Sequence, residues 1–174
     1  MTFTKVVLTL LLFTVCLSPS CAGRGNRLES WETTNKSFRV RITAYDERGV
    51  YLHGTYYVFE SARAGSDAWR EFMTLRHDDR PEIPKDQVRF VNDNVGYVFM
   101  GWMFAVTTDG GNTWSIWDAT RDVPDWQWSK YGVIRDVRLE LDGSGKMVLE
   151  PVDDANRKVP EFRTNDFGRH WRAD

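Results

Sequence analysis

Two short stretches carry the residue types and spacing of a chemical motif. Residues 107–114 read TTDGGNTW and residues 164–171 read TNDFGRHW, so both follow the pattern T-x-D-x-G-x-x-W. A phosphate-binding P-loop is excluded, because no Lys follows the glycines and the next residues of the first stretch, TWSIW, are typical of a strand. A calcium-binding EF-hand loop is excluded, because the spaced acids and the final Glu are missing.

A tight turn between two paired strands explains both stretches, which we call the first (107–114) and second (164–171) TDGW hairpins. We expect a two-residue turn in which Gly110 or Gly111 has a positive φ. Asp109 is expected to accept backbone N–H bonds across the turn, and Trp114 to return to the core. The repetition of four positions after equivalent predicted strands indicates a role in folding rather than in catalysis.

The TDGW hairpins resemble the Asp-box of the sialidase-type (BNR) β-propeller repeat. Residues 95–114, VGYVFMGWMFAVTTDGGNTW, are also similar to blades of photosystem assembly-factor propellers. The resemblance implies that each hairpin is a structural turn between the third and fourth strands of a blade, away from any catalytic centre. The structural residues that it implies are Thr107, Asp109, Gly111, Thr113, Trp114, Thr164, Asp166, Gly168 and Trp171.

The elements around these hairpins predict an all-β domain over 37–174. Aromatic residues are abundant, with eight Trp, ten Phe and six Tyr, and strands favour them. Three antiparallel, blade-like units are expected, at 37–72, 88–118 and 134–173. The first unit has Gly65 and Trp69 in its turn but no Asp at the expected place.

Three units are too few for an ordinary closed propeller, which has at least four blades. The predicted arrangements are therefore a compact three-sheet assembly, a half-ring completed by a partner, or a flattened barrel.

The first 22 residues have the pattern of a secretory signal peptide: a single charge at Lys5, the apolar run 6–17, and then small residues with a Pro. Cleavage is expected before Cys21, which would then be lipidated as in a bacterial lipoprotein, or otherwise after Ala22. Residues 23–36 are predicted to be a linker. Disulfides are not expected, because Cys16 would leave with the signal.

The charge pattern gives no nucleic-acid footprint. The formal net charge is −2, and Lys and Arg are scattered rather than clustered. We therefore expect no nucleic-acid partner, contact with a membrane only through the lipid anchor, and a location in the bacterial periplasm or on the cell surface.

A small sialidase-like glycan hydrolase is the alternative function. That chemistry needs converging arginines and a Tyr–Glu pair, and the strands offer Tyr56, Tyr57 and Glu60. Alternation along one strand puts Tyr56 and Glu60 on the same face. The available arginines are Arg39, Arg41, Arg89, Arg135 and Arg138.

No metal or cofactor is predicted. The run His77-Asp78-Asp79 is followed by Arg80-Pro81, which indicates a solvated loop rather than a ligand set. His53 and His170 stand alone in the sequence.

The segment 115–131, SIWDATRDVPDWQWSKY, is the most distinctive connection. Its candidate binding residues are Trp117, Trp126, Trp128 and Tyr131. Flat aromatic rings beside charged residues suit a sugar ring or a protein partner. The alternative is that these rings close the open end of the sheet assembly. Together these features predict an exported binding or scaffold protein, without catalysis, that recognises a protein or glycan.

Overall fold

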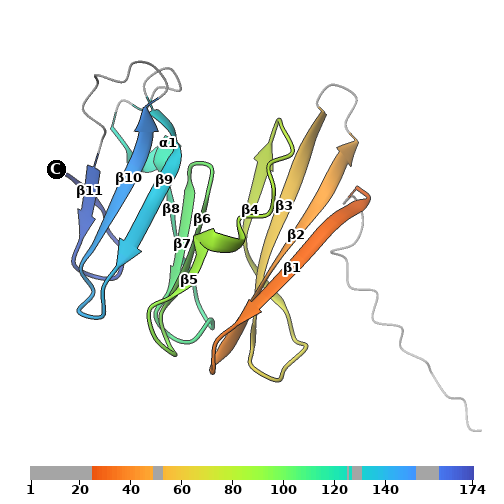
Figure 1. Cartoon of the computed structure of the whole chain (residues 1–174), viewed down its shortest axis with the longest axis horizontal. Helices are drawn as coiled ribbons and strands as arrows, with labels where there is room; N and C mark the ends of the chain where they lie inside the picture. The colour runs from red at the N-terminus through yellow and green to blue at the C-terminus, as the bar shows by residue number, and fades with distance from the viewer. Residues whose placement is uncertain (1–24, 49–52, 125, 127–130, 152–160) are drawn as a thin grey trace, which may run out of the picture.

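The computed structural model describes residues 25–48, 53–124, 126, 131–151 and 161–174 of the chain. The protein is all-β, as predicted, and its strands form three four-stranded antiparallel sheets, which we call sheets A, B and C (Figure 1). None of the sheets closes into a barrel, so the flattened-barrel arrangement is wrong. The predicted signal segment and Cys21 lie outside the described residues.

Each sheet is a simple meander in which strands adjacent in sequence pair with each other. Sheet A consists of β1 (Arg27–Thr34), β2 (Phe38–Arg48), β3 (His53–Arg63) and β4 (Arg70–His77). Sheet B consists of β5 (Val88–Phe90), β6 (Gly96–Met100), β7 (Met103–Thr107) and β8 (Ser115–Asp118). Sheet C consists of β9 (Tyr131–Leu139), β10 (Gly145–Pro151), β11 (Glu161–Thr164) and β12 (Arg172–Ala173).

Two short helices lie between the sheets in sequence. A 3₁₀ turn, η2 (Lys85–Gln87), leads into sheet B, and α1 (Ala119–Asp122) follows β8. The side chain of Asp118 caps α1 by accepting the N–H of Thr120. Within the described part of the chain, no helix has the length and apolar character needed to cross a membrane.

Sheet B lies between sheets A and C, and a hydrophobic core fills each of the two interfaces (Figure 1). The A–B core includes Phe38, Ile42 and Phe59, while the B–C core includes Phe104 and Met147. Because sheet B is covered on both faces, β6 is buried at all five positions. The sequence of β6, GYVFM, is therefore continuously apolar rather than alternating.

The outer faces of sheets A and C are polar. In β2, Arg39 and Arg41 alternate with the fully buried Val40 and so point away from sheet B. In β9, the exposed Arg138 lies beside the buried Val137 in the same way. In a stack of repeated units, the terminal units need a polar outer face. The polar outer faces of sheets A and C therefore favour the compact three-sheet assembly among the predicted arrangements.

The prediction that residues 23–36 form a linker is wrong, because β1 occupies most of this range. Residues Arg27–Thr34 pair antiparallel with β2 along its length, and Trp31 packs against the A–B core. The segment RLESWETT has only one large inward side chain, since β1 is an edge strand with polar residues facing outward. The first unit therefore begins ten residues earlier than predicted, at 27 rather than 37.

Candidate functional site

The first TDGW hairpin is held together by the side chains of Thr107 and Asp109. The Thr107 hydroxyl donates to the Asp109 carboxylate (2.9 Å) and accepts the Gly111 N–H (2.9 Å). The carboxylate also accepts the N–H groups of Asn112 (3.1 Å) and Thr113 (2.9 Å) and the Thr113 hydroxyl (2.6 Å). Partial burial acts to raise the pKa of Asp109, but these hydrogen bonds outweigh it and hold the pKa below its ordinary value.

The prediction that Asp109 accepts backbone N–H bonds is confirmed, but the predicted two-residue turn is wrong. β7 ends at Thr107 and β8 begins at Ser115, so the connection is longer. Both Gly110 and Gly111 have a positive φ, at 68° and 79°. The Asp109 side chain replaces the ladder hydrogen bonds across this wider turn.

The second TDGW hairpin repeats these contacts. The Thr164 hydroxyl donates to Asp166 (2.7 Å) and accepts the Gly168 N–H (3.0 Å). Asp166 accepts the His170 N–H (3.1 Å), and its other oxygen lies 2.6 Å from His170 Nδ1. His170 thus takes the place of Thr113. Burial acts to raise the pKa of Asp166, but the bonds from His170 and Thr164 outweigh it and lower the pKa to about 2.

The Trp of each TDGW hairpin packs on a Phe of the preceding sheet. Trp114 meets the ring of Phe38 edge-on, with centroids 6.2 Å apart, and stacks on Phe72 at 3.9 Å. Trp171 meets Phe104 edge-on at 5.4 Å. Both hairpins therefore fasten one sheet to the next, which is a structural task.

The corresponding Trp of sheet A is Trp69, and no sheet precedes sheet A within the described residues. Trp69 is half-buried, and two guanidinium groups of its own sheet cover the indole instead. The Arg39 guanidinium lies 4.6 Å from the ring centroid, and that of Arg41 lies 4.2 Å from it. Both distances are within the range of cation–π attraction. Trp69, Arg39 and Arg41 therefore form one unit, which we call the Trp69 platform.

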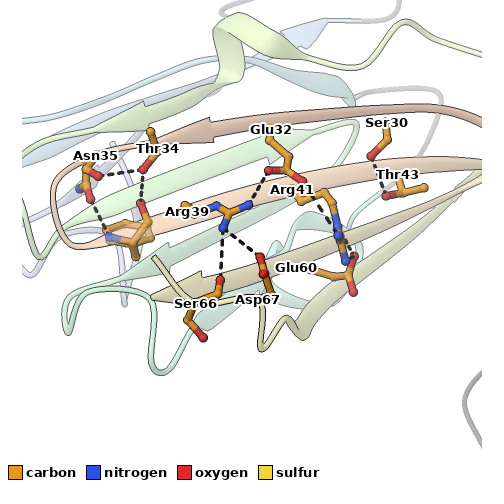
Figure 2. A network of polar contacts seen from close by, with 11 residues as sticks. Ser30, Glu32, Thr34, Asn35, Arg39, Arg41, Thr43, Glu60, Ser66 and Asp67 are labelled. Carbon is orange, nitrogen blue, oxygen red and sulfur yellow. Dashed lines mark hydrogen bonds and ion pairs between the residues drawn. The ribbon is translucent and has the colours of Figure 1, made fainter. Parts of the chain in front are cut away.

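Carboxylates on neighbouring strands hold the arginines of the Trp69 platform in place (Figure 2). Arg39 binds Glu32 of β1 at 2.9 Å and Asp67 of the β3–β4 turn at 3.4 Å. Arg41 binds Glu60 of β3 at 2.7 Å. The hydrogen bond that Arg39 donates to the Glu32 carboxylate raises the pKa of Arg39 above its ordinary value. The platform is therefore a charged, aromatic surface with ordered side chains on the outer face of sheet A.

Alternation along the sequence FRVRI puts Arg39 and Arg41 on one face of a strand, but it does not reveal the site. The missing signals were Glu32, which lies on the unpredicted strand β1, and Trp69, which the sequence analysis treated only as part of a turn. The cross-strand register Glu32↔Arg41↔Glu60 shows how alternation on three strands collects these charges.

The aromatic segment 115–131 does not form a single surface. The prediction of Trp117 as a binding residue is wrong. Its side chain is only 7% exposed and packs edge-on against Phe162 at 5.6 Å, in the B–C core. The cause is its pairing with Phe104, which turns the ring toward sheet C. Trp126 is partly buried against the same core. Trp128 and the side chain of Tyr131 lie outside the described residues.

The residues considered for a hydrolase do not form one site. Tyr56 and Glu60 share the outer face of β3, as alternation predicts, and Glu60 is bound to Arg41. Tyr57 faces the A–B core and donates to the Pro81 carbonyl. Arg89 bridges sheets B and C through Asp136 at 3.0 Å. Arg135 and Arg138 are on sheet C. Arg138 binds the same Asp136 carboxylate at 3.0 Å, and Arg135 lines the hollow beside it. The five arginines therefore lie at two sites, one on the outer face of sheet A and one around Asp136.

The histidines of the described residues have local partners. His77 ends β4, accepts the Asp79 N–H at 3.2 Å, and lies over Trp102 with ring centroids 6.1 Å apart. His170 is bound to Asp166, while the side chain of His53 is outside the described part. Among the residues that the structure describes, no three His, Cys, Asp or Glu side chains gather as metal ligands would.

No family model, curated protein or solved structure matches the chain. The protein is therefore classed by its fold: three blade-like sheets, two of which end in a TDGW hairpin that fastens them to the sheet before.

Proposed function

We propose that this is an exported, lipid-anchored binding protein of the cell envelope, built on BNR-type units and without catalytic activity. The observation that supports a binding role is the Trp69 platform. Trp and Arg are the side chains most enriched at the energetic centres of protein interfaces. Here both types are combined on the outer face of a sheet on which no other described sheet packs.

The ion pairs around the platform favour binding because they order the side chains before a partner arrives. A long Arg side chain loses rotamer freedom when a partner immobilises it, and that loss weakens binding. Glu32, Glu60 and Asp67 already hold Arg39 and Arg41 in one geometry. Much of this loss has therefore occurred on folding.

A protein partner fits the platform better than a glycan does. Two guanidinium groups lie over the Trp69 ring at 4.2 and 4.6 Å, so they compete with a sugar for the ring face that they occupy. The mixed charges suit a protein surface whose acids and bases complement them. The apolar run 6–17 and Cys21 support the proposed export and anchoring. The location that we propose on this basis is the periplasm or the cell surface.

The experiment compares partner capture by the anchored wild-type chain with capture by Trp69→Ala. Loss of a central interface Trp costs roughly 2 kcal/mol or more, which is a loss of affinity of about 30-fold. A protein captured from envelope extracts by wild type should therefore be lost from the variant. Leu141→Ala is the matched control, since Leu141 is a large side chain 72% exposed on the β9–β10 turn.

Three results would contradict the proposal. Capture of the same protein by the Trp69→Ala variant would show that the platform is not part of the interface. Binding of purified envelope glycans, with no protein captured, would make the protein a glycan-binding one. Hydrolysis of a sialoside that stops in Glu60→Gln would establish the hydrolase alternative.

A further inference from the structure

The outer face of sheet C carries a line of four basic side chains that crosses all four of its strands. Arg138 of β9 pairs with Lys146 of β10, Lys146 with Arg163 of β11, and Arg163 with Arg172 of β12. Directly paired residues of antiparallel strands project to the same face. We call these four residues the cationic row.

The neighbours of the cationic row show that it faces away from sheet B. Val137, Met147 and Phe162 each adjoin a member of the row in sequence and are buried in the B–C core. The side chains of Arg138, Lys146 and Arg163 are 77%, 44% and 62% exposed, and Arg172 is exposed as well. The row therefore lies on solvent-facing surface at the opposite end of the stack from the Trp69 platform.

Like charges that face each other across strands destabilise a sheet, and the row contains three such pairs in succession. Nearby acids relieve part of this repulsion. Lys146 binds Glu161 at 2.7 Å and Arg163 binds Asp174 at 2.7 Å. Arg138 binds Asp136 at 3.0 Å, but that carboxylate is shared with Arg89.

The local acids do not form ion pairs with every cation on this face. Two cations form no ion pair with any residue in the described ranges: Arg172 at one end of the row, and Arg135, which lies beside Arg138 at the other end. A shallow hollow of about 370 Å³ lies at one end of the row, lined by Arg135, Arg138 and Lys146 with Asp136 and Val148. Another of about 360 Å³ at the far end is lined by Arg163, Arg172 and His170 together with the acids Asp166 and Asp174. An anion that reaches along the row can use both.

We propose that the cationic row docks an acidic protein helix that lies across the strands of sheet C. The row is a line rather than a plane, because Asp136 and Glu161 both pair with Val148 and form an acidic row directly beside it. A flat anionic membrane would meet both rows together, whereas a rod of negative charge can follow the cations alone.

The spacing of the row agrees with that of a helix. Strands of a sheet are about 4.8 Å apart, so four strands span roughly 14 Å. Acidic residues at positions i, i+4, i+7 and i+11 of an α-helix lie on one face and span about 16 Å at a rise of 1.5 Å per residue. Each carboxylate can therefore meet one cation of the row.

The test uses the full chain and a labelled, Ala-rich helical peptide with Glu at i, i+4, i+7 and i+11. Fluorescence anisotropy should show binding that weakens as salt is raised, since exposed charges are screened. The double variant Lys146→Glu/Arg163→Glu should weaken binding by roughly tenfold or more, because each reversal replaces an attraction with a repulsion. Lys36→Glu, a single charge reversal of the same kind at an 86% exposed side chain, should leave it unchanged.

A milder variant separates binding from folding. Lys146→Gln removes one of the like charges, so its thermal midpoint should stay the same or rise while binding to the peptide falls. Trp69→Ala should bind the peptide as wild type does, which makes this proposal independent of the platform.

The proposal is overturned if a peptide of the same composition, with its Glu spread around the helix, binds equally well. It is also overturned if the double variant binds as wild type does. Two other occupants would replace the helix: vesicles with anionic lipid, if they bind where the peptide does not, and a second copy of this chain, if self-association in light scattering is lost in Arg163→Glu.

Discussion

The indole N–H of Trp114 donates a hydrogen bond to the hydroxyl of Ser61 at a distance of 3.0 Å. The same hydroxyl donates onward to the carbonyl oxygen of Gly111 at 2.9 Å. Ser61 is on β3 and only 2% exposed, so one side chain of sheet A satisfies two groups of the first TDGW hairpin. The Trp171 indole N–H, by contrast, is buried with no hydrogen-bond partner among the described residues.

Ser61→Ala is expected to lower the free energy of unfolding by about 1–3 kcal/mol, because it leaves a partly buried donor and a partly buried acceptor unsatisfied. Urea denaturation followed by fluorescence measures the change. Ser115→Ala is the control, since Ser115 is exposed on β8. Equal effects of the two substitutions would show that the Ser61 hydroxyl does not join the sheets.

Gly111 and Gly65 provide a matched pair for testing the contact between the first TDGW hairpin and sheet A. Their φ angles are 79° and 76°, but a Cβ on Gly111 would lie 2.9–3.1 Å from atoms of Phe38, whereas a Cβ on Gly65 meets nothing within 4 Å. Gly65→Ala should cost about 1 kcal/mol from backbone strain alone. Gly111→Ala should cost about 1–3 kcal/mol more through overpacking. Thermal melts that give the same loss for both would contradict the tight packing on Phe38.

Sheet B shows how much of the fold could be predicted. The unit predicted at 88–118 has the same bounds as sheet B, because burial on both faces makes β6 and β7 continuous apolar runs bounded by turn residues. β1 could not be predicted in the same way. Its segment RLESWETT buries a single large side chain, and its place is fixed by pairing with β2 rather than by its own pattern.

The two candidate surfaces needed the register of the strands. The Trp69 platform depends on Glu32 and Glu60 meeting Arg41 from strands on either side. The cationic row requires four residues, 34 positions apart from first to last, to come into line across sheet C. Alternation predicts which face a side chain takes, but a shift of one residue in pairing would disperse both surfaces.

Asp109→Ala should lower the free energy of unfolding by about 1–3 kcal/mol, because several backbone and side-chain donors lose a charged acceptor. Asp166→Ala should cost less, since its hairpin leads only to the two-residue strand β12 and can fray. Denaturation midpoints of the two variants test the order. An unchanged midpoint for Asp109→Ala would contradict the structural role of the hairpin.

Trp117→Ala should destabilise the protein by roughly 3–5 kcal/mol, because it opens a cavity between Phe104 and Phe162 in the B–C core. Trp126→Ala should cost less, since Trp126 is only partly buried at the edge of that core. Thermal melts compare them. A Trp117→Ala protein that melts like wild type would show that this ring lies on the surface rather than in the core.

The second TDGW hairpin should weaken in acid. The pKa of Asp166 is about 2, below its ordinary value of 3.8, because the hydrogen bonds from His170 and Thr164 outweigh the effect of burial. A carboxyl with a lowered pKa stabilises the fold above its unfolded pKa, and that contribution is lost as the pH falls through the folded pKa. The loss should therefore run from about pH 4 down to pH 2.

NMR titration of the Asp166 carboxyl measures this pKa directly, and the signals of the Trp171 ring report whether the hairpin stays packed on Phe104. In His170→Ala the carboxyl loses its 2.6 Å contact, so its pKa should rise toward 3.8 and the hairpin should open at a higher pH. Asp109, whose corresponding contact is with the Thr113 hydroxyl, should titrate the same in both proteins. A pKa for Asp166 that is unchanged by His170→Ala would show that the imidazole does not hold this carboxylate.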